Sequence, residues 1–167
     1  MKKVIIVASL FLVFNVANAQ TEKFGHINSA DLLQKLPEVK GADSTLKAYQ
    51  QTLEDQNTSM LGEYKQKTDD YTNNSKGWTD AVKEVKEQEI QDLQNRIQTF
   101  QQTAQDKLSN KKEEIYTPIL KKAEDAIKAV AKANGYTYVF DTSAGAVVYS
   151  EDSNDLLPLV EKQLNLK

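Results

Sequence analysis

Apolar residues are unevenly distributed along this chain, and their distribution divides it into two dense ends and a long polar middle. The ends, Phe24–Leu36 and Tyr136–Leu166, are rich in Ile, Val, Leu, Tyr and Phe. The middle, from about Gly41 to Asn134, is rich in Gln, Lys, Asp and Glu and carries a thin apolar stripe at helical spacing. Such a stripe cannot form a globular core alone, so the helical middle must bury it against another helix or another protein. The pattern predicts a compact body with long arms, which suits holding a large partner better than transforming a small one.

The first half of the middle predicts a helix from near Gly41–Ser44 to about Thr72. Gln56 and Lys67 fall where further apolar residues are expected. The segment Thr72–Asp80 is the strongest loop signal of the middle, and Thr79 or Asp80 can cap the helix that returns from it. The apolar positions of the first helix are separated by threes, fours and sevens: Leu46, Tyr49, Leu53, Met60, Tyr64 and Tyr71.

The returning helix is predicted from Asp80 to Asn134. Its stripe repeats about every 3.6 residues, which favours a nearly straight antiparallel pair over a tight supercoil. The return is longer than the first helix, so its last third must lie in the body. The stripe continues in phase across Pro118, so a kink is expected there; two separate helices are the alternative. The stripe consists of Val82, Val85, Leu93, Ile97, Phe100, Ala104, Leu108, Ile115, Ile119, Ala123, Ala126, Val130 and Ala133.

Short elements are predicted in the two apolar ends. Phe24–Asn28 is typical of a strand, and Asn28 can cap a short helix that Pro37 ends. Asn134-Gly135 closes the long helix. Two strands, Tyr136–Phe140 and Ala146–Tyr149, are expected to form a hairpin around Asp141–Gly145, before a final helix capped within Asp152–Asp155. The fold class is therefore α+β. The predicted core residues of the body are Ile27, Ile127, Val130, Val139 and Val148.

The first 19 residues have the pattern of a secretory signal peptide. Lys2-Lys3 precede the apolar run Val4–Phe14, and Ala17-Asn18-Ala19 is a cleavage signal ahead of Gln20. The apolar run is too short for a membrane span, although a retained anchor is the alternative interpretation. Because position 20 is not Cys, lipid attachment there is not available. We therefore expect a periplasmic protein that is cleaved near Ala19.

Charge and composition exclude several functions. Without residues 1–19, 19 basic residues face 24 acidic ones, which argues against general affinity for nucleic acid or anionic lipid surfaces. The chain has no Cys and a single histidine, His26, so no catalytic residue, cofactor or metal site is predicted. His26 is expected to pack at a rim, with pH sensing as the minor alternative. Without disulfides, the stability must come from packing or from oligomerisation.

Three aromatic residues of the arm are candidate contacts for a partner: Tyr64, Tyr71 and Trp78. Trp78 lies in the predicted loop at the tip, where it has no obvious core to fill. It either contacts a partner or folds back onto Val82. Seam packing is the competing role for the two tyrosines.

The whole sequence from Gln20 onwards resembles the Skp/OmpH family of periplasmic chaperones. The resemblance is carried by Lys23–Ser29 with Leu32-Leu33 and Leu36-Pro37, by Pro118–Leu120, and most strongly by Ile127–Asp141. It implies a jellyfish-like homotrimer in which strands from three chains build a small β body and helical hairpins surround a cavity. Residues 20–40 and 119–167 would then form the body and trimerisation region, and residues 41–118 the arm, with its tip near 73–80.

The function that the resemblance implies is that of an ATP-independent holdase for unfolded outer-membrane β-barrel proteins. The best-known members are basic, whereas Gly41–Asn134 holds 14 basic and 16 acidic residues. A lipopolysaccharide site is therefore not carried over, and client binding should depend only weakly on salt. The alternative function is that of an exported coiled-coil spacer or adaptor of the cell envelope. A spacer needs a continuous stiff seam, so the interrupted stripe favours the holdase.

Overall fold

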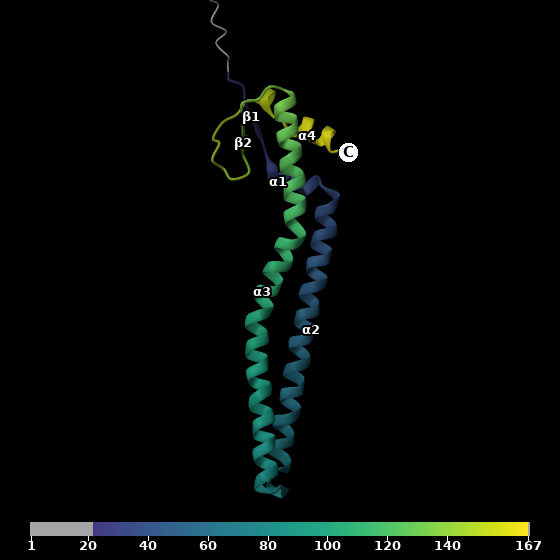
Figure 1. The fold of residues 1–167 in the computed structure, drawn as a ribbon, viewed down its shortest axis with the longest axis vertical. Coiled ribbons are helices and arrows are strands. Elements are labelled where there is room, and N and C mark those ends of the chain that lie inside the picture. The colour runs from purple at the N-terminus through teal and green to yellow at the C-terminus, as the bar shows by residue number, and fades with distance from the viewer. Residues whose placement is uncertain (1–21, 167) are drawn as a thin grey trace, which may run out of the picture.

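The structure, a computed structural model, describes residues 22–166; the predicted signal peptide, residues 1–19, lies outside them. Two long helices, α2 (Pro37–Asn74) and α3 (Asp80–Ala133), lie side by side and form an arm (Figure 1). With 38 and 54 residues, they extend for about 57 Å and 81 Å at 1.5 Å per residue. A short 3₁₀ turn, η1 (Ser75–Gly77), joins them at the tip.

The remaining elements gather with the last turns of α3 at the other end of the molecule (Figure 1). They are β1 (Phe24–Ile27), α1 (Ser29–Lys35), β2 (Tyr138–Asp141), η2 (Asp152–Asn154) and α4 (Leu157–Gln163). The predicted α+β fold, a small strand-bearing body with a long helical hairpin arm, is confirmed.

The sheet of the body differs from the predicted hairpin. β1 and β2 pair in parallel, from Phe24 opposite Tyr138 to Ile27 opposite Asp141. The second strand of the hairpin, predicted at Ala146–Tyr149, is not formed; β2 pairs instead with β1 from the far end of the chain. The other edge of β1 is also engaged: the Leu156 amide donates to the His26 carbonyl at 2.9 Å. Gly145 has the predicted positive φ of 70°, but its turn leads into a loop.

Local capping signals position the helix ends. The Asn28 side chain accepts hydrogen bonds from the first turn of α1, and Thr79 Oγ1 accepts one from the Val82 amide. After α3, Gly135 has a φ of 69°, and the Tyr136 amide donates to the Ala131 carbonyl at 3.0 Å. This is the left-handed helix ending predicted from Asn134-Gly135.

Helix α2 starts earlier than predicted. It begins at Pro37 and not near Gly41–Ser44. The fixed φ of proline suits the first turn of a helix, and its missing amide hydrogen costs nothing there. Pro37 therefore both ends α1 and starts α2.

The main core lies in the body, where α1, the last third of α3 and α4 meet under β1. Its most deeply buried side chains are those of Ile27, Leu32, Leu36, Leu156 and Val160. The core extends to Ala42 and Ile119, where the arm begins. The long return helix therefore belongs to both parts of the molecule, as its length predicts.

Along the arm, the seam between α2 and α3 is thin. Leu53, Leu93 and Ile97 are its buried residues. Val82 and Val85 were expected in the stripe but are exposed. The half-buried positions of α3 near the tip are instead Lys83, Lys86 and Ile90. Gln56 is also exposed, whereas its neighbour Asn57 is half-buried at the seam. The first polar interruption therefore lies one residue later than predicted.

α3 continues as one helix through Pro118, which excludes two separate helices. Figure 1 shows α3 bending along the arm, beside α2; the kink at Pro118 stays a prediction. Two contacts between α2 and α3 flank the proline. The Tyr116 hydroxyl donates to Asp43, and Lys122 forms an ion pair with Glu38.

Candidate functional site

Three aromatic side chains form a ladder on one face of the sheet. Side chains alternate along a strand, so Phe24, Tyr138 and Phe140 project from the same face. The Phe24 ring stacks on Tyr138 at 5.7 Å between centroids and on Phe140 at 6.2 Å. Each of the three keeps about half of its surface exposed. We call these residues the aromatic ladder. It was not predicted, although the period-two spacing of Tyr138 and Phe140 in the sequence is a signal for it.

The loop between β2 and η2, residues 142–151, adds apolar surface beside the ladder and projects from the body (Figure 1). Val148 is 99% exposed and Tyr149 is 81% exposed. Val147 and Tyr149 line a shallow hollow together with Phe24 and Phe140. Val148 was predicted for the core of the body or of the trimer. It is exposed in the single chain, and its burial between copies stays a prediction.

The His26 side chain contacts the backbone at the end of this loop. Its Nε2 lies 3.0 Å from the Glu151 carbonyl oxygen. The histidine is half-buried at the edge of β1, which matches the expected rim position.

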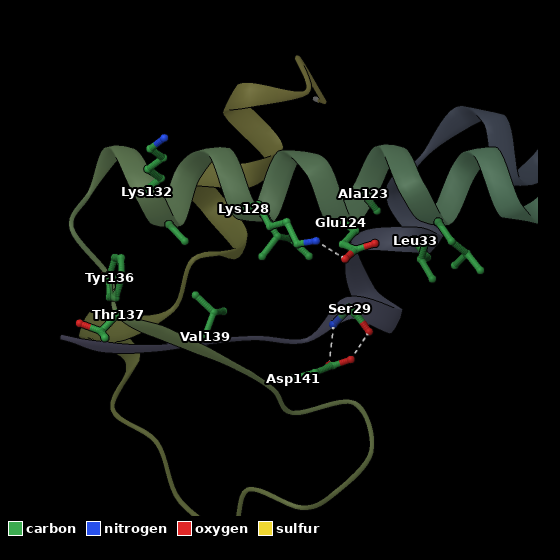
Figure 2. A pocket seen from close by; sticks show the side chains of 13 residues that line it. Ser29, Leu33, Ala123, Glu124, Lys128, Lys132, Tyr136, Thr137, Val139 and Asp141 are labelled. Carbon is green, nitrogen blue, oxygen red and sulfur yellow. Dashed lines mark hydrogen bonds and ion pairs between the residues drawn. The ribbon is translucent and has the colours of Figure 1, made fainter. Parts of the chain in front are cut away.

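A second apolar surface is a groove between α3 and β2, which we call the body groove (Figure 2). Its lining comes from α1, α3 and β2, and not from β1. Figure 2 shows Leu33, Ala123 and Val139 facing this space. Ile127, predicted for the body core, also lines the groove and is half-buried.

Charged groups form the rim of the body groove. Lys128 pairs with Glu124 one turn earlier on α3, and Asp141 accepts hydrogen bonds from Ser29 (Figure 2). Burial alone would raise the pKa of Asp141. The hydrogen bonds from the Ser29 hydroxyl and from the amides of Ser143 and Ser29 outweigh it and lower the pKa to about 2. This carboxylate ties the end of β2 to the start of α1.

The five predicted core residues occupy different environments. Ile27 and Val130 are buried in the core of this chain, Ile127 and Val139 are half-buried, and Val148 is exposed. Contacts of these residues with other copies of the chain stay a prediction.

At the tip of the arm, the structure brings two of the three candidate aromatic contacts together. The Trp78 and Tyr71 rings meet edge to face at 5.7 Å, and the Tyr71 hydroxyl donates to Glu87. Trp78 therefore folds back on Tyr71. Tyr64 lies about two turns further along the seam and is half-buried. The role of all three in binding a partner stays a prediction.

Between Tyr64 and the tip, polar contacts replace apolar packing. Lys67 Nζ lies 2.8 Å from Glu89 Oε2 across the seam, and Lys86 lies 3.6 Å from the same carboxylate. The hydrogen bond from Lys67 lowers the pKa of Glu89, and Glu89 in turn raises the pKa of Lys67. The interruption predicted at Lys67 is therefore an ion pair across the seam, in a place where an apolar contact would stabilise the arm more.

The described surfaces suit binding. Among residues 22–166, no three His, Cys, Asp or Glu side chains lie close enough together to hold a metal ion. Within the same range, no polar or charged residue is fully buried. What the body presents is contiguous apolar surface with a polar rim, which marks interaction sites in proteins.

Comparison with known proteins gives consistent matches. The family described as outer membrane protein (OmpH-like) matches residues 23–164. A curated relative, the chaperone protein Skp of Photorhabdus laumondii, is 29% identical over 171 residues, covering 98% of this chain and 99% of the relative. A crystal structure of an OmpH-like protein from Caulobacter crescentus superposes with a TM-score of 0.75, at 15% identity, over 86% of this chain and 84% of that chain. At this identity, the structural match shows a common fold.

No helix within residues 22–166 is long and apolar enough to cross a membrane.

Proposed function

Because the chain belongs to the family of OmpH-like outer membrane proteins, we propose that it is a periplasmic, ATP-independent holdase. Its clients are unfolded outer-membrane β-barrel proteins, which it shelters from aggregation in a cavity between helical arms. The observation that carries the proposal is the pairing of a long, weakly packed arm with a body whose apolar surface is open. An arm of this kind can adapt to a large and irregular partner.

The open surface of the body supports a homotrimer. Val148 and Tyr149 lie in a segment whose sequence is typical of a strand but which has no strand partner within residues 22–166. Pairing of this segment with another copy would cover it and place several arms around one cavity. This contact is head-to-tail, because it joins the loop segment of one copy to a different surface of the next. It gives a closed ring of three when each copy is rotated by one third of a turn from its neighbour. Residues 20–40 and 119–167 are the proposed trimerisation region.

A single substitution tests the assembly. Val148→Asp places a charge at a position that is 99% exposed in the single chain, so it should not disturb the fold of that chain. We expect the light-scattering mass to fall from three chains to one, because the charge would be desolvated between copies. Val85→Asp is the matched control, since Val85 is also exposed but lies on the arm. Equal masses for both variants would show that the loop is not an interface.

The holdase activity is tested by mixing the mature chain with a urea-unfolded β-barrel protein. A complex of three chains with one soluble barrel supports the proposal, and precipitation of the barrel contradicts it. The arm carries nearly balanced charges, so the binding constant should depend weakly on salt. A steep salt dependence would instead indicate attraction by charge, for which lipopolysaccharide would be the next ligand to test.

Tyr64, Tyr71 and Trp78 are proposed as contacts of the client along the arm. Their rings would supply large apolar area with a polar edge, which suits many weak contacts. The rival function, a coiled-coil spacer of the envelope, needs a stiff arm. The polar seam at Asn57 and Lys67 supports the holdase over the spacer.

A further inference from the structure

The loop between β2 and η2 is held to the end of β1 at both of its ends. At one end, the Thr142 amide donates to the Ile27 carbonyl at 2.9 Å. At the other end, His26 Nε2 lies 3.0 Å from the Glu151 carbonyl oxygen. Between these contacts, no backbone hydrogen bond joins residues 146–150 to any other part of the chain that the structure describes. The position of the loop, which projects from the body in Figure 1, therefore depends on two adjacent residues of one strand.

The backbone of His26 also holds the chain that follows the loop. Its carbonyl accepts a hydrogen bond from the Leu156 amide at 2.9 Å, and Leu156 is fully buried. This contact does not involve the imidazole, so the side chain of His26 controls only the stretch between the loop and Leu156. Imidazole is the one side-chain group whose ordinary charge change lies between pH 5 and 8. Among the described contacts at the base of the loop, the contact with Glu151 is therefore the one that pH can change in this range.

The hydrogen-bond chemistry of the imidazole makes this contact sensitive to protonation. The acceptor is a carbonyl oxygen, so the contact requires a hydrogen on His26 Nε2. A neutral imidazole has a single N–H, and when this hydrogen is on Nδ1 the lone pair of Nε2 faces the carbonyl and the contact is lost. An imidazolium has a hydrogen on both nitrogens, and a charged donor makes a hydrogen bond about twice as strong as a neutral one. Protonation of the ring therefore strengthens the contact.

The charged groups that neighbouring elements bring to the ring are carboxylates. Glu151 lines the same hollow as His26, and Asp155 forms a β-bridge with it. Asp152 is the first residue of η2, which contacts β1. Asp141, at the end of β2, is already bound by hydrogen bonds from α1. Among the described residues that line the hollow, none is Lys or Arg.

The lysines that come before and after β1 in the sequence are engaged elsewhere. Lys23 precedes β1, and its Nζ donates to the Asn134 carbonyl at 3.1 Å. Lys35 of α1 pairs with Glu161 of α4, and this hydrogen bond is the main cause of its raised pKa. Tyr149 also lines the hollow, but a phenol ordinarily keeps its proton between pH 5 and 8. A proton on the ring is therefore placed among negative charges.

We propose that the His26 side chain is a pH-dependent clamp for the loop between β2 and η2. As the pH falls from about 7.5 to about 5.5, the ring gains a proton and holds the Glu151 carbonyl more firmly to β1. We call this contact the His26 clamp. The inference goes beyond the proposed function, because it concerns the geometry of a single chain and not the binding of a client.

The direction of the effect follows from the surroundings of the ring in two states. With the loop held, the imidazolium donates to a carbonyl oxygen among carboxylates; with the loop detached, the ring faces water. The held state therefore binds the proton more tightly, so acid favours it. Carboxyl groups ordinarily titrate below pH 5 and keep their charge over this range. Since a charged donor about doubles the strength of one hydrogen bond, we expect the detached population to fall about fivefold.

The clamp has a consequence for assembly. The loop carries Val148 and Tyr149, the exposed apolar residues that are proposed to contact another copy of the chain. A loop that is already held in place loses less conformational entropy when it associates. Acid should therefore favour assembly, and this consequence alone rests on the proposed function.

Two substitutions separate the charge of the ring from its hydrogen bond. His26→Gln keeps a neutral N–H donor and cannot gain a proton in this pH range. His26→Leu removes the donor and keeps a side chain of similar bulk on the sheet. Far-UV circular dichroism checks that both variants keep the helix content of the parent.

Hydrogen exchange of the loop amides, residues 143–151, measures how often the loop detaches. Each variant is compared with the parent at the same pH, so that the intrinsic pH dependence of exchange cancels. We expect the parent to exchange about fivefold more slowly than His26→Gln at about pH 5.5, and nearly as fast at about pH 7.5. His26→Leu should exchange faster than both at either pH. A ratio of parent to His26→Gln that does not change with pH, or that rises in acid, would overturn the proposal.

The parent protein gives a second readout without any substitution. His26 is the only histidine in the sequence, so its Cε1–H proton resonance can be followed by NMR without ambiguity. We expect the protection of the loop amides, corrected for intrinsic exchange, to follow the same pH curve as this resonance. Protection that follows a different curve would show that another group is responsible, and the proposal would be wrong.

The clamp and the proposed function can fail separately. Light scattering at several protein concentrations, at the same two pH values, reports assembly. If acid tightens the assembly of the parent and not of His26→Gln, both proposals are supported. If the exchange responds to acid but the assembly does not, the clamp is supported and the proposed contact of the loop between copies is wrong. If the chain assembles but the exchange ratio does not change with pH, the clamp is wrong and the proposed assembly stands.

Discussion

Replacing Gly25 by Ala tests how closely the body is packed under the sheet. A Cβ atom at Gly25 would lie 2.4 Å from Leu156 Cδ1 and 2.8 Å from the Tyr136 ring. Leu156 is fully buried, so its side chain cannot move into solvent. Overpacking of this kind costs about 1–3 kcal/mol. We expect Gly25→Ala to lower the free energy of unfolding by about 2 kcal/mol, near the middle of that range.

Three further variants isolate the cause. Gly62→Ala makes the same chemical change in α2, where nothing lies within 4 Å of the new methyl group, and should raise stability by about 0.5–1 kcal/mol. Leu156→Ala alone should cost about 2–5 kcal/mol because it leaves a cavity. Combined with Gly25→Ala, it removes the clashing atom, so the double variant should cost less than the sum, by at least about 1 kcal/mol.

Urea unfolding, followed by far-UV circular dichroism at one protein concentration, measures the stability of the parent and of the four variants. The concentration must be fixed because the stability of an oligomer depends on it. Strict additivity of Gly25→Ala and Leu156→Ala, or equal effects at Gly25 and Gly62, would refute the packing argument.

Three other predictions concern single contacts. Thr79→Ala removes the cap of α3 and should cost about 1 kcal/mol, measured by thermal unfolding, with Trp78 fluorescence reporting the loss at the tip. The pKa of Asp141 is lowered to about 2, so its carboxylate contributes fully to the free energy of unfolding above the ordinary pKa of 3.8, and this contribution is lost as the pH falls from about 4 to 2. Over this range, the urea midpoint of Asp141→Asn should therefore fall less than that of the parent. Asn57→Leu fills the seam and should increase the hydrogen-exchange protection of the amides around Gln101, and unchanged protection would show that the seam is already rigid.

The helix ends could be predicted because their determinants are local. The Asn28 and Thr79 caps and the Gly135 ending each act within about one turn, so a few residues of sequence contain the whole signal. Pro37 shows where local signals become ambiguous. Its effect on the preceding residue correctly predicts the end of α1, but the same proline is equally suited to begin α2, and that start was not predicted.

The sheet and the seam could not be predicted fully, because both depend on distant partners. Nothing in Tyr138–Asp141 says that it pairs in parallel with Phe24–Ile27, since the two strands are brought together by the entire arm. A shift of one residue turns a helical side chain by about 100°, which separates exposed Gln56 from half-buried Asn57. The same offset of one residue separates exposed Val85 from half-buried Lys86 near the tip.

The parallel pairing of β1 with β2 also dictates the order in which this chain can fold. Phe24 and Tyr138 pair in the sheet, but in the sequence all of α2 and α3 lies between them. Closing so long a loop through a flexible chain is slow, and pairing across it contributes only after closure. If α2 and α3 pair first, starting from the tip, the ends of the two helices bring β1 and β2 close together. Only the short flexible segments next to the strands are then left to close, so the entropy cost of pairing β1 with β2 is small. Formation of the arm would then place β1 and β2 in position to pair. During synthesis, β1 stays without its partner until β2, Tyr138–Asp141, has also been made.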